Sequence, residues 1–100
     1  MTSNKTVFIT GASRGIGRAI AIRFAAAGYQ LALCCRQNTQ LLEDLKQLII
    51  SQYHTDCLIF TGDTGDYRQL EAMISETIAH FHHIDVLVNN AGISYIGLLT

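Results

Sequence analysis

Three glycines with the spacing G-x-x-x-G-x-G separate a strand-like segment from an apolar segment with helical periodicity. The turn carries Gly11, Gly15 and Gly17, after the β-branched residues 6–10 and before a helix expected to reach about Ala27. A strand, a glycine turn and a helix in this order place backbone N–H groups at a helix N-terminus, where the partial positive charge favours phosphate. Glycine also permits positive φ angles and close approach of a ligand. The stretch predicts a phosphate-binding turn, with an ordinary strand-to-helix turn as the alternative.

Strand-like and helix-like segments alternate along the rest of the chain. Beyond residues 6–10, the expected strands are residues 30–35, 57–60 and 84–88, with a helix before each of them. The nearly continuous apolar character of residues 30–35 is typical of a parallel strand buried on both faces. The alternation predicts an α/β fold, a doubly wound parallel sheet with right-handed crossovers.

The apolar positions of each helix define the face that we expect to be buried. In the first helix these positions are Ile16, Ile20, Phe24 and Ala27. In the second, which Asn38 or Thr39 can cap, they are Leu41, Leu42, Leu45, Leu48 and Ile49. In the third, where Asp66 and Gln69 resemble a capping box, they are Leu70, Met73, Ile74, Ile78 and Phe81.

Composition excludes several classes of partner. The chain has 100 residues, a formal charge of −1 and a hydrophobic content of 49%, which fits one core-forming domain. Without a basic run or a long apolar run, we expect neither a nucleic-acid nor a membrane partner. The three cysteines form no disulfide framework and no metal-binding pattern, so we expect no metal and a reducing, cytoplasmic compartment.

Two motifs together resemble the short-chain dehydrogenase/reductase family, from Lys5 to about Leu99. They are T-G-x-x-x-G-x-G at residues 10–17 and N-N-A-G at residues 89–92. The resemblance implies a Rossmann fold of which this chain supplies four strands and three helices. It also implies that the family's nicotinamide dinucleotide is the cofactor.

The resemblance assigns the cofactor-binding positions. The diphosphate is expected against Gly11, Ser13, Arg14, Gly15, Ile16 and Gly17. The adenine ring is expected beside Asp63 and Thr64, and the adenosine ribose beside Asn90, Ala91 and Gly92. Alternatively, Asp63 caps its own backbone turn. Asn89 is expected to tie neighbouring strands together.

The end of the second strand favours NADP(H) over NAD(H). An NAD-selective site places an acid there to accept hydrogen bonds from the ribose 2′-hydroxyl, but this chain has Cys35. Arg36 follows, and Arg14 lies in the glycine turn, so two guanidinium groups can bind a 2′-phosphate. The alternative is that both arginines are solvated surface charges.

The family's catalytic Tyr-x-x-x-Lys pair and upstream Ser are absent. The only lysines are Lys5 and Lys46, and neither lies four residues after a tyrosine. Ser94 and Tyr95 follow the N-N-A-G motif too closely to be the family's catalytic residues. We therefore expect residues 1–100 to be the N-terminal cofactor-binding half of one domain, with no catalytic residue of its own.

Within the family, the stretches G-A-S-R-G-I-G-R-A-I at residues 11–20 and V-N-N-A-G-I at residues 88–93 resemble 3-oxoacyl-[acyl-carrier-protein] reductases of fatty-acid synthesis. This resemblance implies hydride transfer to a small or carrier-protein-linked carbonyl compound by a homo-oligomeric enzyme. Residues 92–100 also resemble reductases that finish an aminopentanone modification on elongation factor P. A non-catalytic nucleotide-binding module is the alternative from another class, and residues after Thr100 would discriminate.

The fourth strand supplies a first testable prediction. In the strand order 3-2-1-4-5-6 this strand is internal, so in residues 1–100 alone it becomes an apolar edge without Pro or Lys. We expect an isolated polypeptide of these residues to be poorly soluble or partly unfolded, as measured by sedimentation and circular dichroism. A cooperative thermal melt of a monomer would contradict this expectation.

Overall fold

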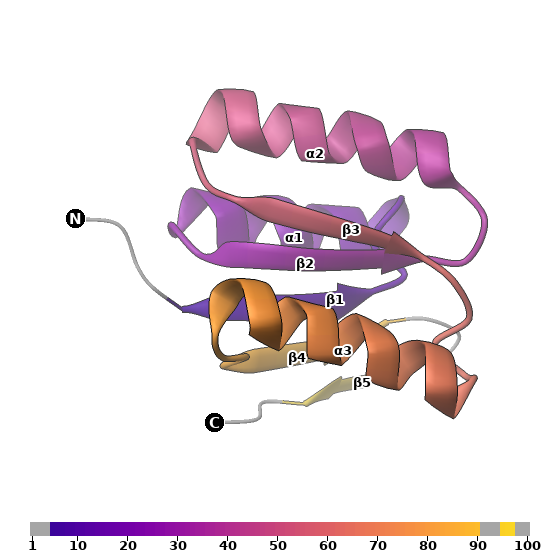
Figure 1. Cartoon of the computed structure of the whole chain (residues 1–100). Coiled ribbons are helices and arrows are strands. Elements are labelled where there is room, and N and C mark those ends of the chain that lie inside the picture. The colour runs from indigo at the N-terminus through magenta and orange to yellow at the C-terminus, as the bar shows by residue number, and fades with distance from the viewer. Residues whose placement is uncertain (1–4, 91–94, 98–100) are drawn as a thin grey trace.

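The computed structural model describes residues 5–90 and 95–97. Along these residues the elements are β1 (Thr6–Thr10), α1 (Gly15–Ala26), β2 (Gln30–Cys35), α2 (Thr39–Tyr53), β3 (Cys57–Thr61), α3 (Tyr67–Phe81), β4 (Val86–Asn89) and β5 (Tyr95–Gly97). The five strands form one sheet of order β3-β2-β1-β4-β5, shown in Figure 1. The first four strands are parallel, which confirms the predicted doubly wound α/β fold.

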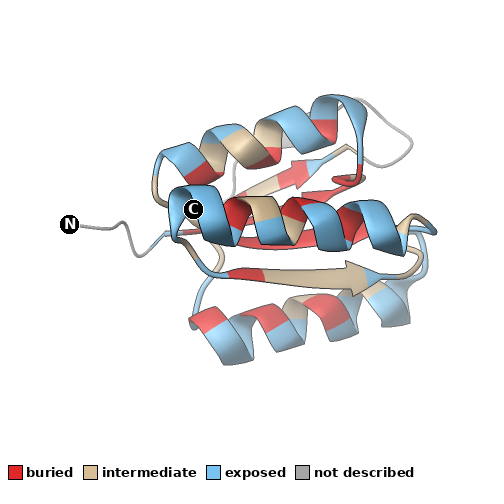
Figure 2. Cartoon of the chain, turned by 90° about the horizontal axis from the view of Figure 1, so that it is seen from above, coloured by how far each residue is buried: buried red, intermediate tan, exposed pale blue. Residues whose placement is uncertain are grey.

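Helices cover both faces of the sheet. One cluster of buried residues joins α1 and α2 to one face, and a second cluster joins α3 to the other. Alternate residues of β2 enter the two clusters: Leu31, Leu33 and Cys35 the first, Ala32 and Cys34 the second. Burial on both faces explains why this strand is apolar along its length. The buried positions of the helices face the sheet (Figure 2).

The edge expected at β4 is not bare in the described residues. β4 pairs with β1 on one side, and β5 adds an antiparallel strand on the other, with Val88 opposite Ile96. A short connection suffices for antiparallel pairing, so a nearby segment can satisfy the backbone groups of an edge. The prediction of four strands therefore missed this fifth, three-residue strand.

Several helix residues that were expected to be buried are exposed in the structure. Ile16, Leu41 and Ile78 are exposed, as is Ala27, whereas the sheet-facing positions of α1 are Gly17, Ala21 and Ala25. In α3 the fully buried neighbour of Ile78 is Thr77, whose hydroxyl donates to the Met73 carbonyl at 2.8 Å. That hydrogen bond lets a polar side chain replace an apolar one in the core.

The start of α3 confirms the predicted cap. Asp66 Oδ1 accepts hydrogen bonds from the backbone N–H groups of Arg68 and Gln69, and Gln69 Nε2 donates to Asp66 Oδ2 at 3.2 Å. These bonds hold the pKa of Asp66 below its ordinary value, with the Gln69 side chain as the largest cause. Asn38 occupies the equivalent position before α2 but makes no side-chain capping bond.

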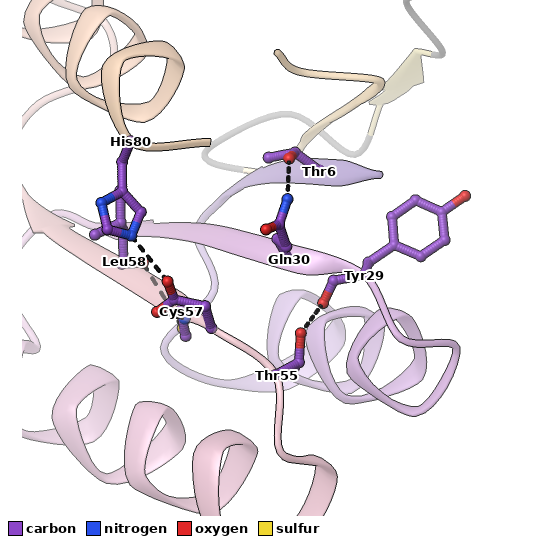
Figure 3. Close-up of polar contacts among 8 residues, drawn as sticks. Thr6, Tyr29, Gln30, Thr55, Cys57, Leu58 and His80 are labelled. Carbon is purple, nitrogen blue, oxygen red and sulfur yellow. Dashed lines mark hydrogen bonds and ion pairs between the residues drawn. The ribbon is translucent and has the colours of Figure 1, made fainter. Parts of the chain in front are cut away.

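Polar contacts join neighbouring elements where the strands begin (Figure 3). Gln30 Nε2 donates to Thr6 Oγ1 at 3.2 Å, and Thr55 Oγ1 donates to the Tyr29 carbonyl at 2.7 Å. His80 of α3 lies 2.8 Å from an Asp56 carboxylate oxygen. These contacts stabilise the end of the sheet that lies opposite to the carboxyl ends of the parallel strands.

β4 begins at Val86 rather than Ile84. Asp85, the residue before it, bonds to β1 with both its backbone and its side chain. Its N–H donates to the Thr6 carbonyl, and its carboxylate accepts from the Thr6 N–H, each at 2.8 Å. The Thr6 N–H is the main cause that holds the pKa of Asp85 below its ordinary value.

No helix in the described parts of the chain is long and apolar enough to cross a membrane.

Adjacent leucines on α2 test the orientation of this helix. Leu42 is fully buried and Leu41 is 43% exposed. In the complete product of the reading frame, we expect Leu42→Ala to lower the free energy of unfolding by about 2–5 kcal/mol through loss of burial and a cavity. Leu41→Ala, the matched control, should change it by at most about 0.5 kcal/mol. Urea unfolding measures both, and equal losses would show that the orientation is wrong.

Candidate functional site

A cavity of about 750 Å³ opens where β1, β2 and β3 end. Its walls come from the turns that follow these strands and from the end of β4. Seven predicted site residues line it: Gly11, Ser13, Arg14, Arg36, Asp63, Thr64 and Asn90. In open α/β sheets, ligands bind in such a crevice outside the carboxyl ends of the strands.

The glycine turn has the backbone that its sequence predicts. Gly11 and Gly15 have φ angles of 62° and 63°, in the left-handed region that favours glycine. Arg14 precedes the first turn of α1, where no side chain caps the helix and no acidic residue is present. The first amides of α1 therefore present an uncompensated partial positive charge next to the cavity, as an anion-binding helix N-terminus does.

Gly17 permits a close contact between α1 and the end of β1. A Cβ atom at this position would lie 2.0 Å from the Gly11 carbonyl oxygen and 2.8 Å from Asn90 Nδ2. No side chain fits there. Gly15, Ile16 and Gly17 belong to the first turn of α1 and are not among the residues that line the cavity. They can offer a ligand their backbone N–H groups.

The end of β4 is tied to the glycine turn by two asparagines. Asn89 Oδ1 accepts from Thr10 Oγ1 at 3.0 Å, which confirms the expectation that Asn89 links neighbouring strands. The Asn90 N–H donates to the same Thr10 hydroxyl at 2.9 Å, and Asn90 Nδ2 donates to the Gly11 carbonyl at 3.2 Å. Asn90 thus supports the turn in addition to lining the cavity. Ala91 and Gly92 lie outside the described residues.

At the other end of the cavity, opposite charges face each other. Arg36 Nη2 lies 3.8 Å from Asp63 Oδ2, and the two side chains are 76% and 43% exposed. Asp63 Oδ1 accepts from the Gly65 N–H at 2.8 Å, so the turn-capping alternative holds for this oxygen. The sequence did not predict the Arg36–Asp63 pair, since the two residues belong to different strand–helix turns.

Gln37, Asn38 and Gly62 also line the cavity, although they were not predicted as site residues. Their only sequence signal is their position in the turns that follow β2 and β3. Cys35 lines the cavity but is almost completely buried, with Sγ 3.9 Å from Thr61 Oγ1. Its thiol cannot replace the carboxylate that an NAD-selective site places there.

The three cysteines are free and buried, as expected for small core residues. Burial raises the pKa of Cys34 far above its ordinary value and that of Cys57 to about 12. The thiols of Cys34 and Cys57 therefore stay protonated and unreactive at neutral pH. Among the residues that the structure describes, no group of His, Cys, Asp or Glu side chains could hold a metal ion.

The parallel sheet, the glycine turn and the cavity at the strand ends form the doubly wound α/β arrangement, in which ligands bind outside the carboxyl ends of the strands. The short chain dehydrogenase family model matches residues 5–99, and the chain belongs to this family. Dehydrogenase/reductase SDR family member 7B of Bos taurus is 43% identical over 102 residues, covering 96% of this chain and 31% of that protein. The 3-oxoacyl-[acyl-carrier-protein] reductase FabG of Staphylococcus aureus strain Mu50 is 37% identical over 99 residues, covering 99% and 40%. The chain thus spans between 31% and 40% of the length of these two relatives.

Solved structures of the same family superpose closely on this chain. L-sorbose reductase from Gluconobacter frateurii, complexed with NADPH and L-sorbose, has a TM-score of 0.84 at 33% identity. The superposed part covers 91% of this chain and 34% of the L-sorbose reductase chain. A short chain dehydrogenase from Mycobacterium paratuberculosis, bound to NAD, has a TM-score of 0.85 at 26% identity and covers 91% and 38%. Similar proteins therefore bind either nicotinamide dinucleotide.

The contact at Gly17 gives a test of the cavity. Overpacking a tight contact costs about 1–3 kcal/mol. In the complete product of the reading frame, we expect Gly17→Ala to displace the first turn of α1 and weaken NADPH and NADH binding about tenfold or more. Fluorescence titration measures both affinities, and circular dichroism checks that the variant is folded.

Arg18→Ala is the control for this substitution, because Arg18 is the exposed neighbour on the same helical turn and does not line the cavity. It should bind both dinucleotides within about twofold of the unmodified protein, since exposed positions away from a site have small effects. Unchanged affinity in a folded Gly17→Ala variant would show that this turn does not hold the diphosphate.

Proposed function

We propose that this chain is the cofactor-binding portion of an NADP(H)-dependent carbonyl reductase. The single observation that carries the cofactor preference is the composition of the cavity after β2. Cys35 stands at the position of the NAD-selective acid, and the exposed Arg36 follows it. Arg14 lines the same cavity from the glycine turn.

Two interactions with different selectivity support this proposal. The amides of the first turn of α1 suit the diphosphate that both dinucleotides share. Arg14 and Arg36 suit the 2′-phosphate that only NADP(H) carries, because guanidinium groups form charge-assisted, bidentate bonds to phosphate. A carboxylate at the end of β2 would repel this phosphate, and none is there.

The proposed reaction is the reduction of a ketone to a secondary alcohol. NADPH supplies the hydride, and a proton completes the hydroxyl group. Within residues 1–100 we assign cofactor-binding roles only: the turn from Gly11 to Gly17 for the diphosphate, Arg36 for the 2′-phosphate, Asp63 and Thr64 for adenine, and Asn90, Ala91 and Gly92 for the ribose. No catalytic residue is assigned in this chain.

The substrate class that we favour is a 3-oxoacyl thioester on a carrier protein. The similarity to the Staphylococcus aureus reductase over 99% of this chain supports this assignment. The resemblance to elongation factor P reductases rests on residues 92–100, most of which lie outside the described residues. Three buried, free cysteines support a reducing compartment such as the cytoplasm.

Arg36→Asp tests the cofactor preference. The substitution removes a phosphate partner and installs the acid that favours a free 2′-hydroxyl. A hydrogen bond to a charged group contributes about 1.5–3 kcal/mol, so NADPH affinity should fall about tenfold to a hundredfold while NADH affinity holds or rises. Parallel titrations of the complete product with both cofactors measure the change.

The control for this substitution is Arg23→Asp, the same charge change at an exposed position near the end of α1, outside the cavity. It should leave the ratio of the two affinities unchanged. An unchanged ratio in Arg36→Asp would contradict the assignment of Arg36 to the 2′-phosphate. Oxidation of NADPH by a 3-oxoacyl thioester tests the substrate class separately.

A further inference from the structure

We propose that Asp63 sets the strength of NADP(H) binding by competing with the 2′-phosphate for Arg36. This inference rests on the proposed function, because it needs Arg36 to be the phosphate partner. In this inference Asp63, which follows β3, opposes NADP(H) binding, whereas the residues that follow β2 favour it.

The geometry that carries the inference is the Arg36–Asp63 pair. The charged atoms are 3.8 Å apart, and both residues line the same cavity. A carboxylate at this distance attracts the guanidinium that the phosphate must bind. An incoming 2′-phosphate therefore either displaces Arg36 from Asp63 or shares it.

Asp63 is held in place, whereas Arg36 is free to turn toward a ligand. Asp63 Oδ1 accepts from the Gly65 N–H, and the Asp63 N–H donates to Gln69 Oε1, each at 2.8 Å. Gln69 is itself bonded to Asp66 at the start of α3. The Arg36 side chain is 76% exposed. When the phosphate binds, Arg36 moves and the Asp63 carboxylate stays in the cavity.

This arrangement affects the two cofactors differently. NAD(H) has no 2′-phosphate, so Arg36 keeps its pairing with Asp63 when NAD(H) binds. NADP(H) must overcome the pairing, and the remaining carboxylate also repels its phosphate. Since both groups are exposed to solvent, the interaction is screened and the effect is moderate.

Asp63→Asn is the variant that separates these effects. Asn keeps a side-chain oxygen for the Gly65 N–H and removes only the charge. An exposed pair of this kind changes affinity by about two- to fivefold. We expect the ratio of NADPH affinity to NADH affinity of the complete product to rise by this factor. Because both cofactors carry adenine, a lost adenine contact would weaken both alike and leave their ratio unchanged.

Three further variants complete the experiment. Glu76→Gln makes the same charge change at an exposed α3 position outside the cavity and should leave both affinities unchanged. Arg36→Gln removes the shared partner, so adding Asp63→Asn to it should change NADPH affinity much less than in the unmodified background. Isothermal titration at low and high salt measures all five proteins, and the gain from Asp63→Asn should shrink as salt rises.

The possible failures are distinguishable. If the unmodified protein binds neither cofactor, the proposed function is wrong and this inference fails with it. If it binds NADPH but Asp63→Asn leaves the ratio of affinities unchanged, only the role of Asp63 is wrong. An equal gain with and without Arg36 would also overturn the inference, because it would indicate charge repulsion without competition for Arg36.

Discussion

The contact between the first turn of α1 and the end of β1 is the constraint on which the site depends. Gly17 lies where a Cβ atom would collide with the Gly11 carbonyl oxygen. Asn90 Nδ2 donates to that carbonyl, and the Asn90 N–H donates to Thr10. One backbone group therefore joins β1, α1 and the end of β4, and this junction aims the helix N-terminus at the strand ends.

The same close approach decides which face of α1 is buried. A helix that touches the sheet at a glycine leaves room only for small side chains along that line, here Ala21 and Ala25. Of the larger residues, Ile20 and Phe24 are only partly buried at the border of the core cluster, and Ile16 is exposed. With Val86 and Val88 they line an apolar groove of about 430 Å³. Apolar periodicity identifies the helix, but helix-to-sheet distance, which the periodicity does not carry, selects the buried face.

The fold and the local motifs could be predicted from the sequence because short-range rules determine them. The apolar run in β2 follows from burial on both faces, and the Asp66 cap follows from a fixed offset along the chain. The Arg36–Asp63 pair, the cavity position of Gln37 and the buried Thr77 depend on how distant turns and helices meet. The short strand β5 likewise depends on which segment lies beside β4. No pattern within one element predicts these relations.

In the proposed function, different groups of the cavity determine binding strength and selectivity. Backbone amides at the start of α1 favour any diphosphate, and their position is fixed by the contact at Gly17. Selectivity between two cofactors is a difference between two affinities, so it must come from groups that meet only the 2′ position. In the proposed function this selectivity comes from Arg36 and Arg14, which bind the 2′-phosphate, and from Asp63, which competes for Arg36. The three side chains lie on separate turns, and their charges can change without disturbing the sheet. When backbone amides hold the diphosphate and surface side chains meet the 2′ position, single surface substitutions can change the cofactor preference while the shared diphosphate stays bound.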